Sequence, residues 1–455
     1  MRSRNIETEF NNIEIIDISD VGRGIGRSSN GLIVFVENAV PGDIVNARIT
    51  RKKKNYVNAV ASDIVRPSPF RIIPECPYAE VCGGCALSHI SYDMQLKIKE
   101  KHVRDKLERI GRVTDPAIRP AVPSPSEFRY RNKAEFTIAG NKVGFNAAHT
   151  HDVFDCEDCL LQHPAAAACA DAVRKYTGKY GDDLRRLLVR TSSDGEVMVM
   201  VTSPAGISHP DYLYKALGNA AGSAGCGLAS FYQRVQPRRG HAAQELIGGM
   251  ASICEKIGGV TFEISPSSFF QVNTEGAKLL CEKVKEYAAL TGDENVLDLY
   301  CGVGSIGQYC AGSAGYVLGI ESSRSAVKDA RRNAALNGIP NVKYIPGKAE
   351  IILPEAVGIA DKTRKYEDIA LLTAKNADVV ILDPPRAGCG EKLLRAAAMP
   401  EPEKIVYVSC DAGTLARDVK ILGSLGYRLA EATPVDMFAQ TGHVETVCLM
   451  SRDEG

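Results

Sequence analysis

One cysteine, Cys410, ends an apolar run and stands where an α/β protein would place a nucleophile. The run at 405–408 (IVYV) predicts a buried strand, and Ser409-Cys410-Asp411 follows it directly. In an open parallel sheet, ligands bind at the carboxyl ends of the strands. A thiolate at such an edge attacks electrophilic carbons, whereas most other cysteines of the chain are expected to be buried thiols. We therefore predict that Cys410 is a catalytic nucleophile.

A glycine-rich turn upstream predicts the ligand that would lie beside this thiol. Residues 295–300 (NVLDLY) predict a buried strand, and 301–307 (CGVGSIG) predict a turn with the G-x-G-x-x-G spacing of dinucleotide sites. Glu321 ends the next predicted strand, where it would accept both ribose hydroxyls of NAD or of S-adenosylmethionine. Asp298 favours S-adenosylmethionine, because a carboxylate repels a pyrophosphate and attracts an ammonium group. The alternative is a glycine-rich turn without a ligand.

A methyl donor beside a thiol predicts methylation of a carbon that is a poor nucleophile by itself. C5 of a pyrimidine is such a carbon: addition of the Cys410 thiolate at C6 makes C5 enolate-like, and C5 then attacks the methyl group. A base must afterwards remove the C5 proton so that the cysteine can leave. Glu445, in T-G-H-V-E-T, is the predicted base, and Asp383, in D-P-P-R, is predicted to hydrogen-bond the pyrimidine edge.

Three further cysteines have the spacing of metal ligands. Cys76, Cys82 and Cys85 form C-x5-C-G-G-C, in which the glycines let the backbone fold around an ion. No histidine lies at the usual zinc-finger spacing, and thiolate ligation with a distant fourth cysteine suits a closed, structural [4Fe–4S] cluster. Cys159 is the preferred fourth ligand, and Cys156 remains an alternative. Without a metal, the motif would be three cysteines in a reduced turn.

The elements that would position these residues divide the chain into three regions. A chain of 455 residues exceeds one ordinary core. Its 55 Lys and Arg balance 55 Asp and Glu, so the net charge gives no argument for a polyanionic partner. We predict a barrel over 6–67, a central α/β iron–sulfur domain over 68–264, and an S-adenosylmethionine-dependent methyltransferase domain over 265–455.

The first region has short β-rich runs that are separated by glycine and proline turns. The runs lie at 13–18, 32–36, 44–49 and 57–64. Their even spacing predicts a small barrel of the OB kind. The order G-R-G-I-G, V-F-V, A-V-P-G-D and R-I-T-R-K-K-K resembles a TRAM domain, an RNA-binding barrel of RNA-modifying enzymes. A small β domain with a basic hairpin and no ligand is the alternative.

Local charge favours RNA where the total charge does not. Residues 97–133 hold eleven basic and five acidic residues, and 51–54 adds four cations. Apolar residues recur at helical spacing over 91–111, which predicts an amphipathic helix with its cations outward and a contact with the catalytic domain. Residues 128–133 (FRYRNK) interleave aromatic and basic side chains, as surfaces for single-stranded RNA do.

The remaining pattern predicts two α/β regions. Strands at 135–138, 187–191 and 197–202 alternate with Ala/Gly-rich helices in the central region. After residue 265, strands and helices alternate throughout, which predicts a doubly wound, Rossmann-like parallel sheet. No apolar run is long enough to span a membrane, and the first ten residues have no apolar signal core. We expect a soluble, cytoplasmic protein with no membrane partner and no obligate protein partner.

Five motifs together resemble one family. They are S-P-x-x-F-x-Q-V-N at 265–273, D-L-Y-C-G-V-G at 298–304, D-P-P-R-A-G at 383–388, S-C-D-A-G-T-L-A-R-D at 409–418 and T-G-H-V-E-T at 441–446. With the TRAM-like start and the cysteine motif, they resemble the RNA uracil-5-methyltransferase family over nearly the whole chain. The resemblance is greatest to the bacterial 23S rRNA branch.

The resemblance implies roles for individual residues. It makes Cys410 the nucleophile and Glu445 the base, and it places a [4Fe–4S] cluster on Cys76, Cys82, Cys85 and Cys159. It implies contacts with S-adenosylmethionine from Gln271, Tyr300, Glu321, Asp383, Ser305 and Glu350. The implied product is 5-methyluridine in 23S rRNA, at a uridine flipped out of a loop or an unfolded segment.

Two positions depart from the family pattern. Family members often have Asn at the position of Asp411, and a negative charge there is expected to raise the pKa of the Cys410 thiol. Asn is also common at the position of Ser305.

Four other functions are weighed against this one. A tRNA uracil-5-methyltransferase shares the chemistry, but that branch is expected to lack the barrel and the cysteine motif. A cytosine-5 RNA methyltransferase would need a cysteine where Pro385 stands. A nicotinamide oxidoreductase is disfavoured by Asp298 and by Cys410. A non-catalytic iron–sulfur RNA-binding protein would keep RNA binding when Cys410 is replaced.

Overall fold

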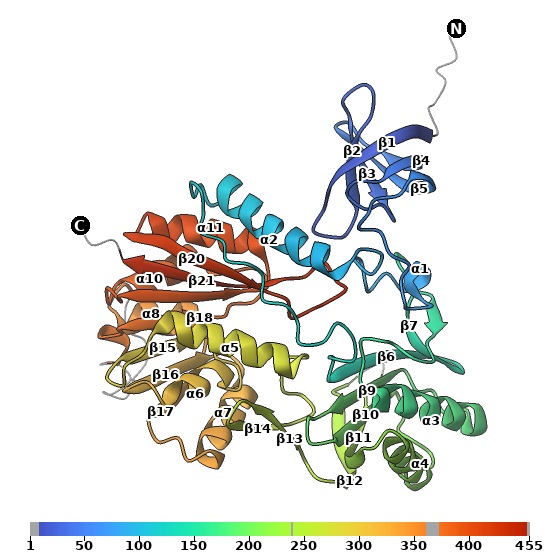
Figure 1. The fold of residues 1–455 in the computed structure, drawn as a ribbon. Coiled ribbons are helices and arrows are strands. Elements are labelled where there is room, and N and C mark those ends of the chain that lie inside the picture. The colour runs from blue at the N-terminus through green and yellow to red at the C-terminus, as the bar shows by residue number, and fades with distance from the viewer. Residues whose placement is uncertain (1–8, 238–239, 361–372, 453–455) are drawn as a thin grey trace. The chain divides into compact units, whose positions relative to one another are not determined.

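The computed structural model describes residues 9–237, 240–360 and 373–452, which belong to two compact units (Figure 1). One unit is formed within 1–102 together with 438–443, and the other within 103–437 together with 444–455. Parts of the predicted domains lie outside the described residues, namely 6–8, 238–239, 361–372 and 453–455. The domain bounds 6–67, 68–264 and 265–455 remain predictions.

The first unit begins with a closed barrel whose strand order is β1-β2-β3-β5-β4. The strands are β1 (Glu9–Ile18), β2 (Gly24–Arg27), β3 (Ile33–Glu37), β4 (Ile44–Lys52) and β5 (Tyr56–Arg66). Alternate residues face the interior, so Val34 and Val36 are fully buried while their neighbours are not. A Cβ atom at Gly26 would lie 2.4 Å from Ile13 Cγ2, so the close approach of β1 and β2 requires glycine there. The predicted OB-like barrel is confirmed.

Two helices follow the barrel: α1 (Ala79–Cys82) and α2 (Tyr92–Arg109). The basic helix predicted over 91–111 is therefore confirmed, but its cations do not all point outward. Lys99 is completely buried, and its Nζ donates to the Phe438 carbonyl at 3.1 Å, which compensates the buried charge. Further along α2, Val103 and Leu107 lie in the main core of the second unit, as predicted for contact with the catalytic domain.

The second unit contains a central sheet of seven strands in the order β12-β11-β10-β9-β6-β7-β8. The strands are β6 (Lys133–Ala139), β7 (Lys142–Asn146), β8 (Val153–Asp155), β9 (Arg186–Thr191), β10 (Glu196–Ser203), β11 (Gly227–Val235) and β12 (Ala243–Gly249). Helices α3 (Pro164–Tyr180) and α4 (Pro210–Ser223) pack on one face, where Leu187 and Val189 join their core. Arg190 and Leu188 alternate with these residues and face the other way.

A hairpin of β13 (Ile253–Ile257) and β14 (Val260–Ile264) leads from the central sheet to the catalytic one. The segment 265–273 follows it and carries the predicted cofactor contact Gln271. Arg190 holds this segment by donating to the Ser268 carbonyl at 3.0 Å.

The catalytic sheet has seven strands in the order β17-β16-β15-β18-β19-β21-β20 (Figure 1). The strands are β15 (Asn295–Leu299), β16 (Tyr316–Glu321), β17 (Val342–Pro346), β18 (Val379–Leu382), β19 (Lys404–Ser409), β20 (Tyr427–Val435) and β21 (Glu445–Arg452). The strands from β17 to β19 are mutually parallel, and β21 runs antiparallel between β19 and β20. The predicted doubly wound sheet is confirmed, with an antiparallel pair at one edge.

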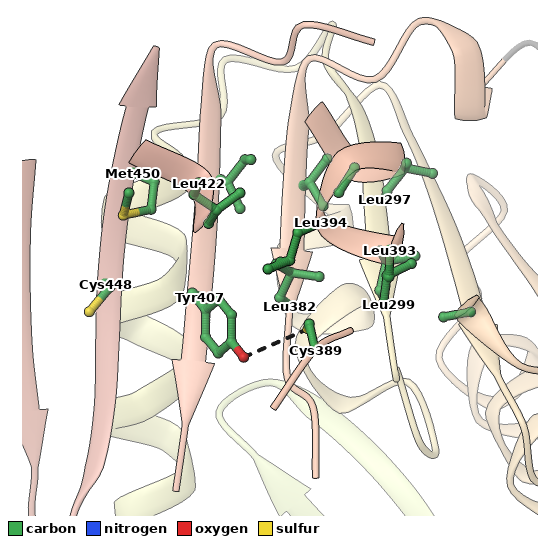
Figure 2. Close-up of a cluster of buried hydrophobic side chains, with 14 of the residues drawn as sticks. Leu297, Leu299, Leu382, Cys389, Leu393, Leu394, Tyr407, Leu422, Cys448 and Met450 are labelled. Atoms are coloured by element: carbon green, nitrogen blue, oxygen red, sulfur yellow. Dashed lines mark hydrogen bonds between the residues drawn. The ribbon is translucent and has the colours of Figure 1, made fainter. Parts of the chain in front are cut away.

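Helices cover both faces of this sheet. They are α5 (Thr274–Ala288), α6 (Ser305–Ala311), α7 (Arg324–Leu336), α8 (Ala349–Ala356), α10 (Glu391–Ala398) and α11 (Ala412–Gly423). Figure 2 shows the core on one face, where Leu297 and Leu299 of β15 meet Leu393 and Leu394 of α10. Near-continuous apolar strands are the pattern of a parallel sheet buried on both faces. In the described parts of the chain, no helix combines the length and apolarity needed to cross a membrane.

Candidate active site

The catalytic sheet brings the predicted reaction residues to one edge. Cys410 follows β19, Asp383 follows β18 and Glu321 ends β16, and parallel strands present these ends on the same side. Glu445 begins the antiparallel strand β21, so it starts from that edge as well. The paired residues Ser409 and Thr446 lie next to Cys410 and Glu445, which brings the two side chains to adjacent strands.

Cys410 is half-buried among charged side chains. Burial raises the pKa of its thiol, the Glu445 carboxyl raises it further, and the Arg386 guanidinium lowers it. Asp383 also raises it, so these three residues all lie close enough to act on the sulfur. A thiol in this setting depends on Arg386 to be ionised near neutral pH.

Two carboxyl groups at this edge have pKa values close to neutral pH. Glu445 is 6% exposed, and burial followed by the neighbouring Asp383 raises its pKa to about 8, against the effect of Arg386. Burial also raises the pKa of Asp383 to about 7. Carboxyls with such values are suited to exchange protons at neutral pH.

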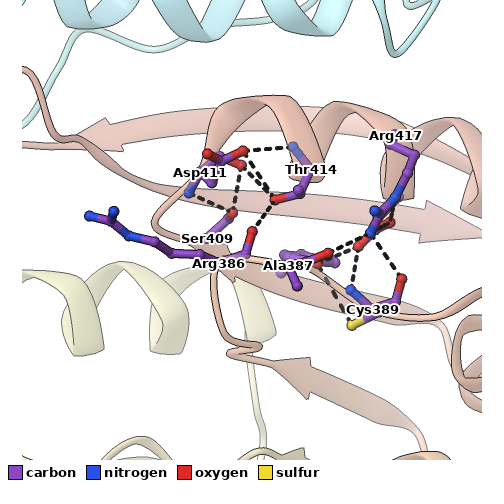
Figure 3. Close-up of polar contacts among 9 residues, drawn as sticks. Arg386, Ala387, Cys389, Ser409, Asp411, Thr414 and Arg417 are labelled. Atoms are coloured by element: carbon purple, nitrogen blue, oxygen red, sulfur yellow. Dashed lines mark hydrogen bonds and ion pairs between the residues drawn. The ribbon is translucent and has the colours of Figure 1, made fainter. Parts of the chain in front are cut away.

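The loop that carries Asp383 and Arg386 is fastened to α11 (Figure 3). Thr414 Oγ1 donates to the Arg386 carbonyl at 3.1 Å, and Arg417 donates to the Ala387 and Cys389 carbonyls at 3.0 Å each. Asp418 is completely buried and accepts from the Cys389 amide at 2.7 Å. Since α11 begins just after Cys410, these bonds fix the Arg386 loop relative to Cys410.

Asp418 also supports the core behind this loop. Its Oδ2 accepts from the Tyr407 hydroxyl at 2.6 Å, and Tyr407 is itself completely buried. Gly388 has a φ of 72°, and a Cβ atom there would lie 2.6 Å from Asp418 Oδ2. The glycine of D-P-P-R-A-G is therefore required both by the backbone conformation and by space.

The glycine turn after β15 leaves room for a ligand. Gly302 has a φ of 56°, and no heavy atom of another residue lies within 4 Å of a Cβ atom built on it. Glu321 borders this space: its Oε2 accepts from the Gly302 amide at 3.2 Å and its Oε1 from the Ser323 amide at 2.6 Å. A carboxylate fixed in this way still has lone pairs for the hydroxyls of a ribose, so the residues present fit a bound nucleoside.

The other predicted cofactor residues lie beside the same turn or in the segment before α5, the helix that precedes β15. The Tyr300 hydroxyl donates to Glu350 Oε1 at 2.7 Å, which joins the loop after β15 to the start of α8. Ser305 is the first residue of α6. Gln271 comes from the segment before α5, and Asn132 Nδ2 donates to its carbonyl at 3.0 Å.

Asp298 does not have the position that its use in the sequence argument required. Its side chain is completely buried, and Oδ2 accepts from the Gly307 amide at 3.0 Å. Burial, and then Asp383, raise its pKa to about 8, so the carboxyl is largely protonated at neutral pH. The expectation that it attracts an ammonium group was therefore wrong: Asp298 ties β15 to α6.

Asp411 is also placed differently from the expectation. It is the N-cap of α11, and its Oδ1 accepts from the Thr414 amide at 2.8 Å. The causes that raise the pKa of Cys410 are burial, Glu445 and Asp383, and Asp411 is not one of them. The negative charge is directed at the helix terminus, where the helix dipole stabilises it.

The cysteines of the predicted cluster belong to two different units. Cys76, Cys82 and Cys85 belong to the first unit and Cys159 to the second. In the described ranges, no three His, Cys, Asp or Glu side chains are gathered so that they could hold a metal ion. Burial raises the pKa of Cys82, and a Cβ atom at Gly84 would lie 3.3 Å from its Sγ. The [4Fe–4S] ligand set therefore remains a prediction.

Sequence reasoning did not assign a role to Arg386. In the motif D-P-P-R, only Asp383 was predicted to have a role. The signal was available, because a cation directly after a loop at the cofactor edge lies near any anion formed there. The segment 128–133 was predicted to expose aromatic rings, whereas Tyr130 is only 9% exposed.

Comparison with known proteins identifies relatives of both units. The family described as tRNA (Uracil-5-)-methyltransferase matches residues 243–453, and the TRAM domain matches residues 11–61. An uncharacterized RNA methyltransferase of Bacillus cereus is 36% identical over 98% of this chain and 98% of its own length. Another, from Caldanaerobacter subterraneus subsp. tengcongensis, is 38% identical and covers 97% of each chain.

A solved structure is similar over the same length. The Pyrococcus abyssi tRNA (uracil-54, C5)-methyltransferase, crystallised with S-adenosyl-L-homocysteine, superposes with a TM-score of 0.73 at 28% identity. The match covers 96% of this chain and 100% of that one. The expectation that tRNA enzymes lack the barrel does not hold for the Pyrococcus abyssi enzyme, so the presence of the barrel does not by itself favour rRNA as the substrate. The chain belongs to the RNA uracil-5-methyltransferase family and carries a TRAM domain.

Proposed function

We propose that the protein transfers a methyl group from S-adenosylmethionine to C5 of a uridine in 23S rRNA and so makes 5-methyluridine. The observation that carries the proposal is the meeting of Cys410, Glu445, Asp383 and Arg386 at the edge that also holds the Gly302 turn. A thiol, a cation and two carboxyls near neutrality are the groups that C5 alkylation of a pyrimidine needs.

S-adenosylmethionine, when bound, supplies an electrophilic methyl group at this edge. Gln271, Tyr300, Ser305, Glu321, Asp383 and Glu350 are the residues proposed to hold it. Glu321 is already fixed by two backbone amides, so it can accept ribose hydroxyls without reorganising.

The protein's own groups carry out the remaining steps. The Cys410 thiol gives up its proton to water and its sulfur bonds to C6, which breaks the C5=C6 double bond and moves its electrons to C5 and O4. C5 would then bond to the methyl carbon while the bond from that carbon to the sulfonium sulfur breaks, so that the donor would leave as S-adenosylhomocysteine. Glu445, as a carboxylate, removes the C5 proton, the electrons re-form the C5=C6 double bond, and the C6–S bond breaks to return the thiolate. Arg386 stabilises the sulfur anion at the start and at the end of the cycle.

Incubation with labelled S-adenosylmethionine tests this proposal. Unmodified 23S rRNA transcript should acquire label that maps to C5 of a uridine, and Cys410→Ala should acquire none. Cys226→Ala is the matched control, because Cys226 is a half-exposed thiol in the central domain. Full methylation by Cys410→Ala would overturn the mechanism, and RNA binding without transfer by the wild type would favour a non-catalytic RNA-binding protein.

A tRNA substrate is the second candidate. The Pyrococcus abyssi enzyme is a tRNA methyltransferase whose whole length matches this chain. The same incubation with a tRNA transcript separates the two, since label on tRNA alone would replace rRNA as the substrate.

We also propose that Cys76, Cys82, Cys85 and Cys159 hold a [4Fe–4S] cluster. Support comes from the C-x5-C-G-G-C spacing and from the close approach of the Gly84 backbone to Cys82. Protein purified without oxygen should contain four iron atoms per chain by the cluster's stoichiometry. Zinc in place of iron, or no metal at all, would contradict the assignment.

A further inference from the structure

The second unit contains a cleft that the proposed chemistry does not use. Its volume is about 220 Å³, and it is lined by residues of 125–132, 163, 191–193, 255 and 273–275. Clefts for drug-sized ligands measure about 300–1,000 Å³, so this one suits a smaller, ring-sized group. None of Cys410, Asp383, Arg386 and Glu445 lines it. It is therefore distinct from the place where the target uracil would react.

The wall of the cleft is continuous with the cofactor segment. Asn132 accounts for the link: its amide donates to the Val272 carbonyl at 2.8 Å, and its Nδ2 donates to the Gln271 carbonyl at 3.0 Å. Asn132 Nδ2 also donates to Thr274 Oγ1 at 3.0 Å. A group seated against Asn132 therefore lies one residue from the backbone that sets Gln271.

A buried carboxylate completes this network. Glu255 is 1% exposed and accepts from Thr274 Oγ1 at 2.9 Å, from Ser193 Oγ at 2.5 Å and from the Ser193 amide at 3.2 Å. Fully engaged polar networks of this kind hold their members in one arrangement. The cleft is thus preformed.

The surface of the cleft is mostly apolar, and the groups that border it favour part of a nucleotide. The N-termini of α3 and α5 both border the cleft, through their N-caps His163 and Asn273, and helix N-termini favour anionic groups. Arg129 and Arg131 both line the cleft, and Arg129 forms an ion pair with Asp158.

His163 offers a neutral donor. Its Nδ1 accepts from the Ala165 amide at 3.2 Å, which leaves the proton on Nε2. Burial, and then Arg129, lower the pKa of His163, so the ring is uncharged at neutral pH. An uncharged N–H donor is suited to an acceptor atom on the hydrogen-bonding edge of a base.

We propose that this cleft binds the base of one RNA nucleotide other than the target uridine, and that Asn132 couples its occupancy to Gln271. The inference rests on the proposed function, because it takes RNA as the substrate. It adds a specificity site: the enzyme would recognise a second base at a fixed distance from the methylated one.

Filling the cleft tests the proposal. Ser126 lines it and is exposed, so Ser126→Trp can occupy the space without disturbing the core. Ser126→Ala is the first control, since it removes the hydrogen bond from Ser126 Oγ to the Phe128 carbonyl without adding bulk. Ser223→Trp, at an exposed serine at the end of α4, is the second. The substrate is the labelled transcript that the wild type methylates, shortened to the region around the mapped uridine.

Ser126→Trp should raise KM for this RNA about 10-fold, the effect of losing one bound base. The dissociation constant of Ser126→Trp for S-adenosylmethionine without RNA and the rate of Ser223→Trp should stay within about twofold of the wild type, and Ser126→Ala measures how much of the loss comes from the hydroxyl alone.

An abasic scan identifies the base. One abasic position in the RNA should raise KM of the wild type about 10-fold. The same abasic RNA should not raise KM of Ser126→Trp any further. An unchanged KM in Ser126→Trp, or losses that add at every abasic position, would overturn the proposal. A failure of the proposed function looks different, because the wild type itself would then methylate no RNA.

Discussion

The catalytic edge and the cleft beside α5 both bury carboxyl groups, but the surroundings of these carboxyls differ. At the edge, Asp298, Asp383 and Glu445 are desolvated until their pKa values rise to between about 7 and 8. In the cleft, Glu255 is just as buried, yet its oxygens accept from Ser193, Lys256 and Thr274. The first region keeps its acids able to exchange a proton, and the second uses an acid to hold structure.

The largest effect is expected where a carboxyl must accept the proton. Glu445→Gln removes the proposed base, so turnover should fall about 10²–10⁴-fold. Thiolate addition and methyl transfer should still occur, and the protein should therefore accumulate as a covalent adduct with methylated RNA on a denaturing gel. A variant that turns over normally and shows no adduct would remove Glu445 from the mechanism.

The pH dependence follows from the same group. The proposed base acts as a carboxylate, and its pKa of about 8 lies above neutrality. From pH 6.5 to pH 8, kcat should therefore rise about 10-fold, as the ionised fraction of such a group does. The raised pKa of Cys410 acts in the same direction. A profile that is flat across this range would show that neither group limits the reaction.

Asp298→Asn should change how stability depends on pH. The folded-state pKa is about 8 and the unfolded value is about 4, so the folded protein binds the extra proton between these values. The unfolding free energy of the wild type therefore decreases as pH rises from about 4 to about 8. The Asn variant lacks this component. Between pH 5 and pH 8.5, its unfolding free energy, measured by urea unfolding, should therefore decrease by several kcal/mol less than that of the wild type. Asp194→Asn, a surface change, should follow the wild type.

The cleft should respond through its hydrogen bonds. Glu255→Ala leaves Ser193 and Thr274 without their acceptor and removes a negative charge that acts on the buried Arg190. The unfolding free energy should fall by about 3 kcal/mol. Urea unfolding at one pH measures it, with Glu275→Ala, an exposed residue of the same cleft, as the control. Equal unfolding free energies of the two variants would show that Glu255 does not hold the structure of the cleft.

The smallest effect concerns Asp411. Asp411→Ala removes the N-cap of α11 and should cost about 1 kcal/mol, whereas Asp411→Asn keeps the cap and should cost little. Neither change should shift the pKa of Cys410, which the pH dependence of thiol alkylation measures. A shift in Asp411→Asn would restore the role that the sequence suggested for this charge.

The two regions also differ in what their sequence reveals. At the edge, each proposed residue directly follows or begins a strand, so the apolar runs before Asp383 and Cys410 were enough to place both at one side of the sheet. The cleft is assembled from segments around Ser126, His163, Ser193, Glu255 and Thr274. Such a site depends on long-range packing, which local patterns do not report.

Burial of polar groups explains the individual errors. Asp298 lies in an apolar run, and no local pattern indicates that its carboxyl accepts from the buried Gly307 amide. Lys99 occupies a helix position that a simple amphipathic pattern leaves to solvent, but the Phe438 carbonyl is available to it. In both cases one specific hydrogen bond overrides the average preference of the residue type.

The place of β21 in the sheet has a consequence for synthesis. This strand is made after β19 and β20, yet it inserts between them and starts with Glu445. A growing chain that has emerged only as far as β20 already possesses its thiol but has neither the neighbouring strand nor the base. On the proposed mechanism, release of the methylated product therefore becomes possible only when the closing hairpin has formed.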